Sequence, residues 1–405
     1  MNSSHRSVRS PQLGLILLAY IAFIALGMPD GLLGVAWPSI HEGFGIPLDS
    51  LGWLLLMATS GYLISSFSSG RLTSRFGIGR VLTASTVLTG LALIAYTLVP
   101  RWWMMVALGF CAGLGAGAID AGLNTYVAAH FSARLMQWLH ASYGIGVTLG
   151  PVIMTLALAT LNGWRLGYRI VGAFQLVLST CFLLTLPMWS KNNAPQKAQE
   201  EKRITDFHTP LGETLKQPRV WLSMLLFFLY VGAEVSLGAW TYTLLTESRH
   251  IPTQLAGVLA GSYWATFTIG RILAGLYSKK ITIDKIIIIG ISCALAGTLL
   301  LWWNPAPWAN LAAVALIGFA IAPVFPALTS GTGQRVEGKF AANTIGMQMA
   351  AGGLSGALVP AAVGVIANRI SLELIPACLA ALFALLLGTY LAATSRKPRQ
   401  KNPVE

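Results

Sequence analysis

The stretch that decides the fold is LGLILLAYIAFIALGMPDGLLGVAW, from Leu13 to Trp37, which carries a single charged residue, Asp30. A run of this length is enough to cross the hydrocarbon core of a bilayer, which takes about 20 apolar residues. The rest of the 405-residue chain has the same character, with 55% hydrophobic residues, 10% charged residues and a mean hydropathy of +0.66. An average soluble domain is about 25% charged, and a disordered chain is poor in apolar residues. A polytopic membrane protein is the class that remains.

Twelve apolar segments of this kind follow one another along the chain. Each is continuous and rich in Leu, Ala, Val, Gly and Ile, which excludes the alternating strands of a membrane β-barrel. The sequence therefore predicts an all-α integral membrane protein with twelve transmembrane helices. The predicted spans are 13–37, 51–70, 81–99, 103–129, 139–161, 168–189, 219–245, 255–277, 284–303, 308–330, 342–367 and 372–394.

The longest polar stretch, 190–218, separates these spans into two sets of six. We expect residues 1–189 to form one six-helix bundle, 190–218 a cytoplasmic linker, and 219–405 a second six-helix bundle with a short cytoplasmic tail. Weak internal similarity supports a duplication. Gly70-Arg71-Leu72 closes the second predicted span, and Gly270-Arg271-Ile272 closes the eighth.

Basic residues are spread unevenly over the predicted loops. The chain has 27 Lys and Arg against 14 Asp and Glu, and with the N-terminus inside, 22 of the 27 fall on the inner side. Lys and Arg concentrate in cytoplasmic loops, so both termini are predicted to be cytoplasmic, in the cell (inner) membrane. The positive charge then faces anionic membrane lipids, and we expect no nucleic-acid partner.

The cysteines and the known enzyme motifs give no indication of catalysis. All four cysteines lie inside apolar runs, so neither a disulfide framework nor a CxxC metal spacing is present. HExxH, GxSxG and P-loop motifs are absent from the sequence. We expect a monomer with no enzymatic activity, no metal and no cofactor. Residues 1–12 show no cleavage site, which favours a first helix over a signal peptide.

Three acidic residues lie inside predicted spans: Asp30, Asp120 and Glu234. An acid at membrane depth costs about 2.5–3.5 kcal/mol on insertion scales and marks a functional site by default. We expect no Lys or Arg deep enough to pair with any of them, and a low dielectric then favours the neutral, protonated carboxyl. Each is a candidate proton carrier. The alternative is a protonated acid that merely bonds a neighbouring helix.

Other polar residues near these acids are candidates for binding a substrate. Pro29, beside Asp30, predicts either a broken helix or a simple kink, and Asn124 shares a helix face with Asp120 because it lies four residues on. The candidate substrate-binding residues are Asp30, Asn124, His140, Tyr143, Glu234, Trp240, Asn343 and Gln348. His140 can equally be a solvated helix end, and Trp240 an interfacial belt residue.

With these features the chain resembles the major facilitator superfamily, whose signature turn after the second span reads roughly G-x-L-a-D-r-x-G-r-r. Residues 70–80 here read GRLTSRFGIGR, and Ser74 stands where that family has Asp. The resemblance implies two bundles that enclose a midplane site and alternate between inward-open and outward-open states. The candidate gating residues are Gly70, Arg71, Arg75, Gly77, Arg80, Gly270 and Arg271.

Three stretches, GMPDGLLGVAWPSI (27–40), GAIDAGLN (117–124) and LHASYGIGVTLGP (139–151), are similar to the fucose permease-like group of sugar:proton symporters. That group is similar to some vertebrate sodium-dependent glucose transporters. The resemblance implies that Asp30 and Asp120 take part in proton coupling and sugar binding. The implied partners are a sugar-like solute and protons, with sodium as a second candidate ion because carboxylates and carbonyls also bind it.

Two other functions stay open. Proton-coupled efflux of a drug or metabolite uses the same fold, although the two glycines that follow Gly-Pro in antiporters are here Val152 and Ile153. A non-transporting membrane protein or enzyme would need a catalytic cluster, and the sequence contains none.

Overall fold

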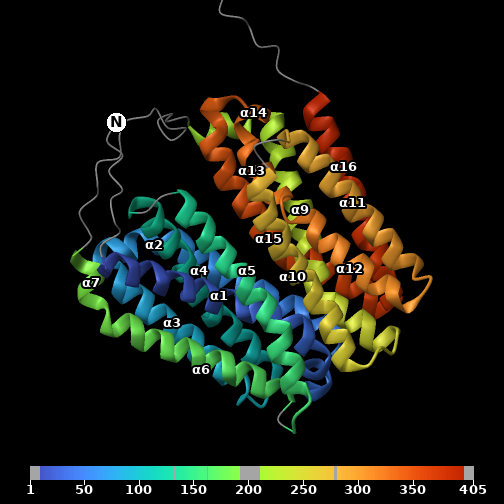
Figure 1. Ribbon diagram of the computed structural model, residues 1–405, viewed down its shortest axis with the longest axis horizontal. Coiled ribbons are helices and arrows are strands. Elements are labelled where there is room, and N and C mark those ends of the chain that lie inside the picture. The colour runs from blue at the N-terminus through green and yellow to red at the C-terminus, as the bar shows by residue number, and fades with distance from the viewer. Residues whose placement is uncertain (1–9, 131–132, 162, 192–209, 278–280, 396–405) are drawn as a thin grey trace, which may run out of the picture. The chain divides into compact units, whose positions relative to one another are not determined.

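The computed structural model describes residues 10–130, 133–161, 163–191, 210–277 and 281–395, and these residues are helical with short connections (Figure 1). The contacts within the chain divide it into two compact units. Unit 1 comprises Met1–Ala198 and Pro252–Gly261, and unit 2 comprises Gln199–Ile251 and Ser262–Glu405.

Unit 1 is built from six long helices and one short one. They are α1 (Ser10–Phe44), α2 (Leu51–Phe76), α3 (Ile78–Tyr96), α4 (Trp102–His130), α5 (Ala133–Leu158), α6 (Gly163–Leu184) and the short α7 (Leu186–Lys191), with the 3₁₀ turn η1 (Leu48–Ser50) before α2. Helix α1 packs against α5 and α6, α2 against α4, and α3 against α4 and α6.

Unit 2 repeats this plan. Its elements are α8 (Leu211–Leu215), α9 (Pro218–Thr243), the π-helical turn η3 (Leu244–Ser248), α10 (Thr253–Tyr277) from Ser262 onward, α11 (Ile283–Trp303), α12 (Pro307–Ile321), α13 (Val324–Ser330), α14 (Thr332–Arg335), η4 (Gly338–Phe340), α15 (Ala341–Arg369), η5 (Leu372–Leu374) and α16 (Ile375–Ser395). The pairs α9–α15, α9–α16, α11–α12 and α11–α16 correspond in order to α1–α5, α1–α6, α3–α4 and α3–α6. The pairing scheme therefore agrees with a six-helix duplication.

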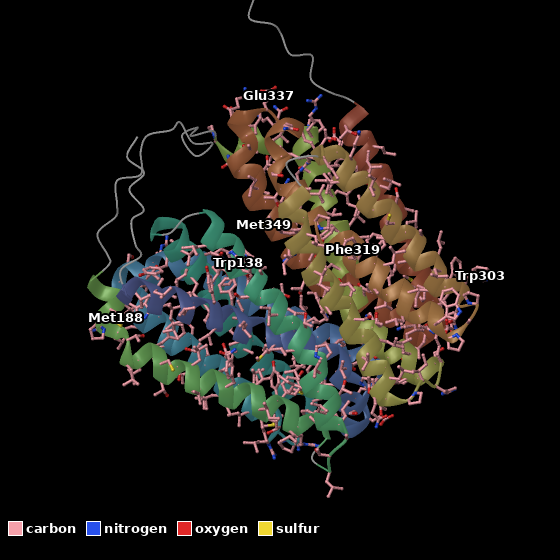
Figure 2. The ribbon with its side chains drawn as sticks, in the orientation of Figure 1. Trp138, Met188, Trp303, Phe319, Glu337 and Met349 are labelled. Carbon is pink, nitrogen blue, oxygen red and sulfur yellow. The ribbon has the colours of Figure 1, made fainter. Side chains whose placement is uncertain are left out.

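Eleven segments of the described residues are long and apolar enough to cross a membrane. The remaining predicted span, the eighth (255–277), corresponds to α10, a 25-residue helix whose Gln254, Tyr263 and Arg271 interrupt its apolar run. The predicted fold class is confirmed: an all-helical membrane protein with twelve long helices in two bundles. Trp303, the last residue of α11, is 77% exposed (Figure 2), as is usual for tryptophan at a membrane interface.

Close helix approach in unit 1 depends on glycine. A methyl group on Gly31 of α1 would collide with the backbone of α5 at Val147, and one on Gly117 of α4 would collide with the backbone of α2 at Tyr62. Small residues at such positions let transmembrane helices pack tightly. These two crossings set the distance between the helices that carry Asp30 and Asp120 and their neighbours.

Candidate functional site

Asp30 lies near the middle of α1, which continues through Pro29 without interruption. Of the two readings of Pro29, the broken helix is therefore wrong. A membrane helix tolerates proline when neighbouring helices support it, and here the contact of Gly31 with Val147 holds α1 against α5. The Asp30 carboxyl consequently projects from a regular helix, and not from an exposed backbone break.

Tyr143 on α5 is the partner of Asp30. Its hydroxyl donates a 2.5 Å hydrogen bond to Asp30 Oδ2. The Asp30 side chain is exposed and Tyr143 is half-buried, so the pair combines a carboxyl and a phenol that a small polar molecule can reach. The sequence predicted both residues as candidates, and the structure brings them together.

Asp120 on α4 accepts two hydrogen bonds. Asn124 Nδ2 donates to Oδ1 over 2.9 Å, which confirms that the two residues share a helix face, and the hydroxyl of Tyr62 on α2 donates to Oδ2. The sequence analysis missed Tyr62. A signal was present, because Tyr62, Ser66 and Ser69 recur at helical spacing and so mark one polar face of α2. Ser66 also bonds α4, donating 3.2 Å to the Gly117 carbonyl.

The two intramembrane carboxyls of unit 1, Asp30 and Asp120, belong to one electrostatic site. The charges of Asp30 and Asp120 interact, and the Tyr62 hydroxyl interacts with both. Throughout the described ranges, no Lys, Arg or His nitrogen forms an ion pair with either carboxyl. Their partners are neutral donors, which do not fix a negative charge as a cation does. The arrangement is chemically suited to taking up and releasing a proton.

Glu234 on α9 has a different environment. It is half-buried, and both Arg271 of α10 and the Tyr230 hydroxyl interact with it electrostatically. The ion pairs between described residues do not include Glu234, so the expectation that no cation pairs with the intramembrane acids stays a prediction. Because α10 continues to Tyr277, Gly270 and Arg271 lie inside the helix and not at its end.

Two further candidates lie in the packed interior of unit 2. Trp240 is fully buried and donates a 2.9 Å hydrogen bond to the Pro360 carbonyl of α15. This placement is neither an interfacial belt nor a surface offered to a substrate. Gln348 is also fully buried, and its Nε2 donates to Ser223 Oγ over 2.6 Å and to Thr332 Oγ1 over 3.0 Å.

Asn343 and His140 each contact a residue that is not one of the intramembrane acids. Asn343 Nδ2 donates a 3.0 Å bond to Thr214 Oγ1, which ties the start of α15 to α8. His140 is exposed and packs edge-on against Phe23, with ring centroids 5.8 Å apart. Neither contact includes one of the three intramembrane acids.

The signature turn between α2 and α3 is stabilised by Gly77. This residue has φ = +79°, which glycine adopts without strain, and its amide donates a 2.9 Å bond to the Thr73 carbonyl. Ser74 donates to the Arg71 carbonyl over 2.9 Å, so its hydroxyl is engaged within its own helix. Gly70 and three arginines around the turn are exposed: Arg71, Arg75 and Arg80. In unit 2, Gly270 instead packs against the backbone of α12.

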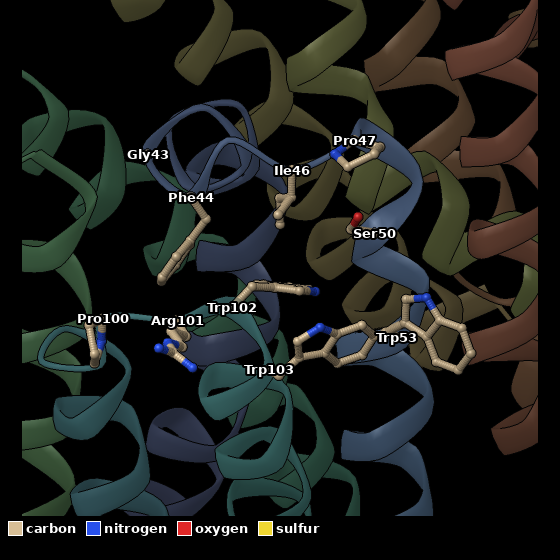
Figure 3. Close-up of a pocket in the computed structure, with 10 residues that line it drawn as sticks. All are labelled: Gly43, Phe44, Ile46, Pro47, Ser50, Trp53, Pro100, Arg101, Trp102 and Trp103. Atoms are coloured by element: carbon tan, nitrogen blue, oxygen red, sulfur yellow. The ribbon is translucent and has the colours of Figure 1, made fainter.

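Two hollows of unit 1 lie at helix ends. One, of about 490 Å³, is formed by the α1–α2 connection and the start of α4 (Figure 3) and is lined by aromatic rings with one cation: Phe44, Trp53, Arg101, Trp102 and Trp103. The other, of about 540 Å³, adjoins the α2–α3 turn. Neither hollow is lined by Asp30, Asp120 or Glu234. The candidate site is therefore formed by these carboxyls and not by either hollow.

Comparison with known proteins identifies the family. The profile of the Major Facilitator Superfamily matches residues 19–360. The chain is 23% identical over 398 residues to the glucose/mannose transporter GlcP of Bacillus subtilis, covering 96% of this chain and 97% of that protein. It is 24% identical over 346 residues to sodium-dependent glucose transporter 1A of Mus musculus, covering 76% and 79%.

Solved structures of the same architecture agree in fold. The nucleoside transporter NupG superimposes with a TM-score of 0.76 at 16% sequence identity, covering 96% of this chain and 100% of that chain. An inward-facing, occupied bacterial homologue of the human lysosomal transporter Spinster superimposes with a TM-score of 0.70 at 15% identity, covering 95% and 94%. Because the family profile extends over most of the chain and the twelve helices form two bundles, the chain belongs to the Major Facilitator Superfamily.

Proposed function

We propose that this protein is a secondary active transporter that carries a monosaccharide-like solute across the cell membrane by alternating access, in symport with protons. The names of two relatives, a glucose/mannose transporter and a sodium-dependent glucose transporter, support a sugar as the cargo. Carboxyls and phenols are suitable partners for sugar hydroxyls, because a carboxylate accepts hydrogen bonds and a phenol both donates and accepts them.

The observation that carries the proposal is the pair of carboxyls in unit 1. Asp30 and Asp120 interact through their charges and are bonded by neutral donors, Tyr143 on one side and Tyr62 with Asn124 on the other. A proton on either acid removes its charge and changes the hydrogen bonds that it makes. Proton binding would then shift the population of inward-open and outward-open states through differential affinity.

The donors around Asp120 favour a proton over sodium as the coupled ion. Both of its carboxyl oxygens already accept a hydrogen bond, from Asn124 and from Tyr62. A hard cation takes several oxygen ligands at once, so sodium would require these donors to turn away. A proton requires only one carboxyl oxygen.

We further propose a monomeric carrier with both termini cytoplasmic, since 22 of the 27 basic residues fall on the inner side of this topology. In this arrangement residues 1–189 and 219–405 form the two bundles and 190–218 connects them. The turn between α2 and α3 would serve as a gating contact through its three exposed arginines: Arg71, Arg75 and Arg80.

The test is uptake by the purified full-length protein in liposomes. A panel of labelled hexoses, pentoses, a nucleoside and an aromatic acid is offered under an inward proton gradient, an inward sodium gradient, or no gradient. We expect accumulation of at least one monosaccharide under the proton gradient and only equilibration without a gradient. Accumulation driven by sodium alone would replace the proton in the proposal. Uptake confined to the aromatic acid or the nucleoside would contradict a sugar cargo.

A further inference from the structure

Pro29 deprives one backbone carbonyl of α1 of its usual donor. In an α-helix the N–H of each residue bonds the carbonyl four residues before it. Proline has no N–H, and its ring crowds that carbonyl, so the Ala25 carbonyl lacks the bond that another residue at position 29 would give. Ala25 is fully buried, and α1 continues through this point as one helix. At membrane depth a freed carbonyl must be bonded by a group from a neighbouring element.

Gln175 of α6 supplies the missing donor. Its Nε2 donates a 2.9 Å hydrogen bond to the Ala25 carbonyl, across 150 residues of the chain. The side chain is 1% exposed, and among the described residues its Oε1 is a buried atom without a hydrogen-bond partner. A buried amide with an unbonded oxygen is unfavourable compared with an apolar side chain of the same shape. The contact that justifies a glutamine at this position is therefore the bond to Ala25.

The corresponding helix pair of unit 2 has neither the proline nor the donor. Helix α9, the counterpart of α1, carries proline only at its first residue, Pro218. Side-chain hydrogen bonds from α16, the counterpart of α6, go to Asp284 of α11 and to carbonyls of α16 itself within the part of the chain that the structure describes. Packing of this helix pair therefore does not by itself require a glutamine. The amide of Gln175 accompanies the proline.

Asp30 is the residue that follows the proline, so the repaired turn carries the carboxyl of the candidate site. On the other side of Asp30, Gly31 packs directly on the Val147 carbonyl of α5. This part of α1 is thus fixed from two sides, by Gln175 of α6 and by the backbone of α5. In this position Asp30 accepts the hydrogen bond from the Tyr143 hydroxyl.

We propose that Gln175 is a positioning residue of the transport site: it replaces the N–H that Pro29 lacks and thereby orients the Asp30 carboxyl toward Tyr143 and the cargo. The effect on cargo rests on the proposed sugar symport. Gln175 acts through the backbone of α1 and need not touch the cargo or the coupled proton.

The first measurement is a double-mutant cycle on thermal stability, which requires no knowledge of the cargo. Gln175→Met keeps an unbranched side chain and removes the donor, whereas Pro29→Ala restores the backbone N–H that can bond the Ala25 carbonyl. The purified single and double variants are compared with wild type. We expect Gln175→Met to lower the Tm more in the presence of Pro29 than in the Pro29→Ala protein, by on the order of 3 °C. Equal Tm changes in both backgrounds would overturn the pairing.

Two matched controls accompany this cycle. Gln348→Met removes a buried amide that bonds side chains of unit 2, so its Tm change should be the same with and without Pro29→Ala. Ser179 lies one turn after Gln175 on α6 and donates to the Leu176 carbonyl of its own helix. Ser179→Ala should likewise show no dependence on residue 29. A dependence as large as that of Gln175→Met in either control would mean that Pro29→Ala changes stability in general, and the pairing would fail.

The second measurement separates positioning of Asp30 from a merely structural role. In liposomes Gln175→Met should raise the KM for sugar by about fivefold, as expected for one lost hydrogen bond, with a smaller change in kcat. The same substitution should raise the KM little further in the Pro29→Ala protein or in Tyr143→Phe, because the contact that it serves is already altered there. An unchanged KM in Gln175→Met would overturn the positioning role. If wild type moves no sugar at all, the proposed function fails, while the Tm cycle still decides whether Gln175 replaces the missing N–H.

Discussion

Tyr143 and Asp30 are 113 residues apart in the chain, yet the phenolic hydroxyl of Tyr143 donates a 2.5 Å hydrogen bond to Asp30 Oδ2. The bond crosses from α5 to α1 at a point where glycines allow the two helices to approach closely. Asp120 is bonded in the same way by Tyr62 of α2. Asp30 and Asp120 thus each accept a hydrogen bond from a tyrosine of a neighbouring helix, which orients the carboxyl.

Replacing Tyr143 with Phe should impair transport through Asp30. The substitution removes the hydroxyl and leaves the ring, so the carboxyl loses one donor that is worth about 1.5–3 kcal/mol for a charged acceptor. We expect the KM for sugar uptake to rise by about tenfold or more, with the Tm close to that of wild type.

The matched control is Tyr20→Phe in the same unit. The Tyr20 hydroxyl donates a 3.1 Å bond to the Leu135 carbonyl and to neither intramembrane acid. This variant should transport like wild type. Equal losses in Tyr20→Phe and Tyr143→Phe would mean that the hydroxyls serve packing alone.

Asp120→Asn and Asp30→Asn should separate coupling from binding. Asparagine at 120 is permanently neutral, so the carrier should still exchange labelled sugar by counterflow but should not concentrate it on a proton gradient. The exposed Asp30 combines a carboxyl with the Tyr143 hydroxyl, so Asp30→Asn should lose both counterflow and uptake. Parallel counterflow and gradient-driven assays provide the measurement. Uphill accumulation by Asp120→Asn would exclude Asp120 as the coupling residue.

Gln348→Leu should affect stability and not cargo affinity. The side chain is fully buried and bonds Ser223 and Thr332. A polar contact between membrane helices is worth about 0.6 kcal/mol on average and up to about 1.7 kcal/mol, and leucine would leave both hydroxyls without this partner. We expect a lower Tm and an unchanged KM. Gln334→Leu, at an exposed position of α14, is the control and should leave the Tm unchanged. A weakened KM with an unchanged Tm would instead support a direct role of Gln348 in binding.

The proposed orientation predicts a difference in chemical access. Lys216→Cys, between α8 and α9, should be shielded from an impermeant thiol reagent in intact cells, whereas Glu42→Cys at the end of α1 should be labelled. Both positions are exposed in the structure, so accessibility of the side chain itself does not decide the result. The assay requires a background without Cys111, Cys181, Cys293 and Cys378. Labelling of Lys216→Cys without labelling of Glu42→Cys would show that the orientation is opposite to the proposed one.

Burial within the bundles changed the interpretation of several residues. From its residue type, Trp240 was expected at the membrane interface or stacked on a substrate. Its indole instead donates a hydrogen bond to the Pro360 carbonyl inside unit 2. Arg271 lies near the end of a predicted span, 255–277, and α10 ends at Tyr277 as predicted. The sequence did not show that the arginine leans back toward Phe267.

By itself, the sequence determined the membrane class, the number of long helices, the six-plus-six division and the shared helix face of Asp120 and Asn124. These features follow from local quantities, namely the length of apolar runs against the bilayer thickness and the four-residue spacing of a helix face. Only the tertiary structure decided that Tyr143 bonds Asp30, that Tyr62 bonds Asp120 and that Trp240 bonds the Pro360 carbonyl. The rotation of each helix about its axis is set by packing against helices far away in the chain, and apolar composition does not encode that rotation because lipid and protein surroundings are equally apolar.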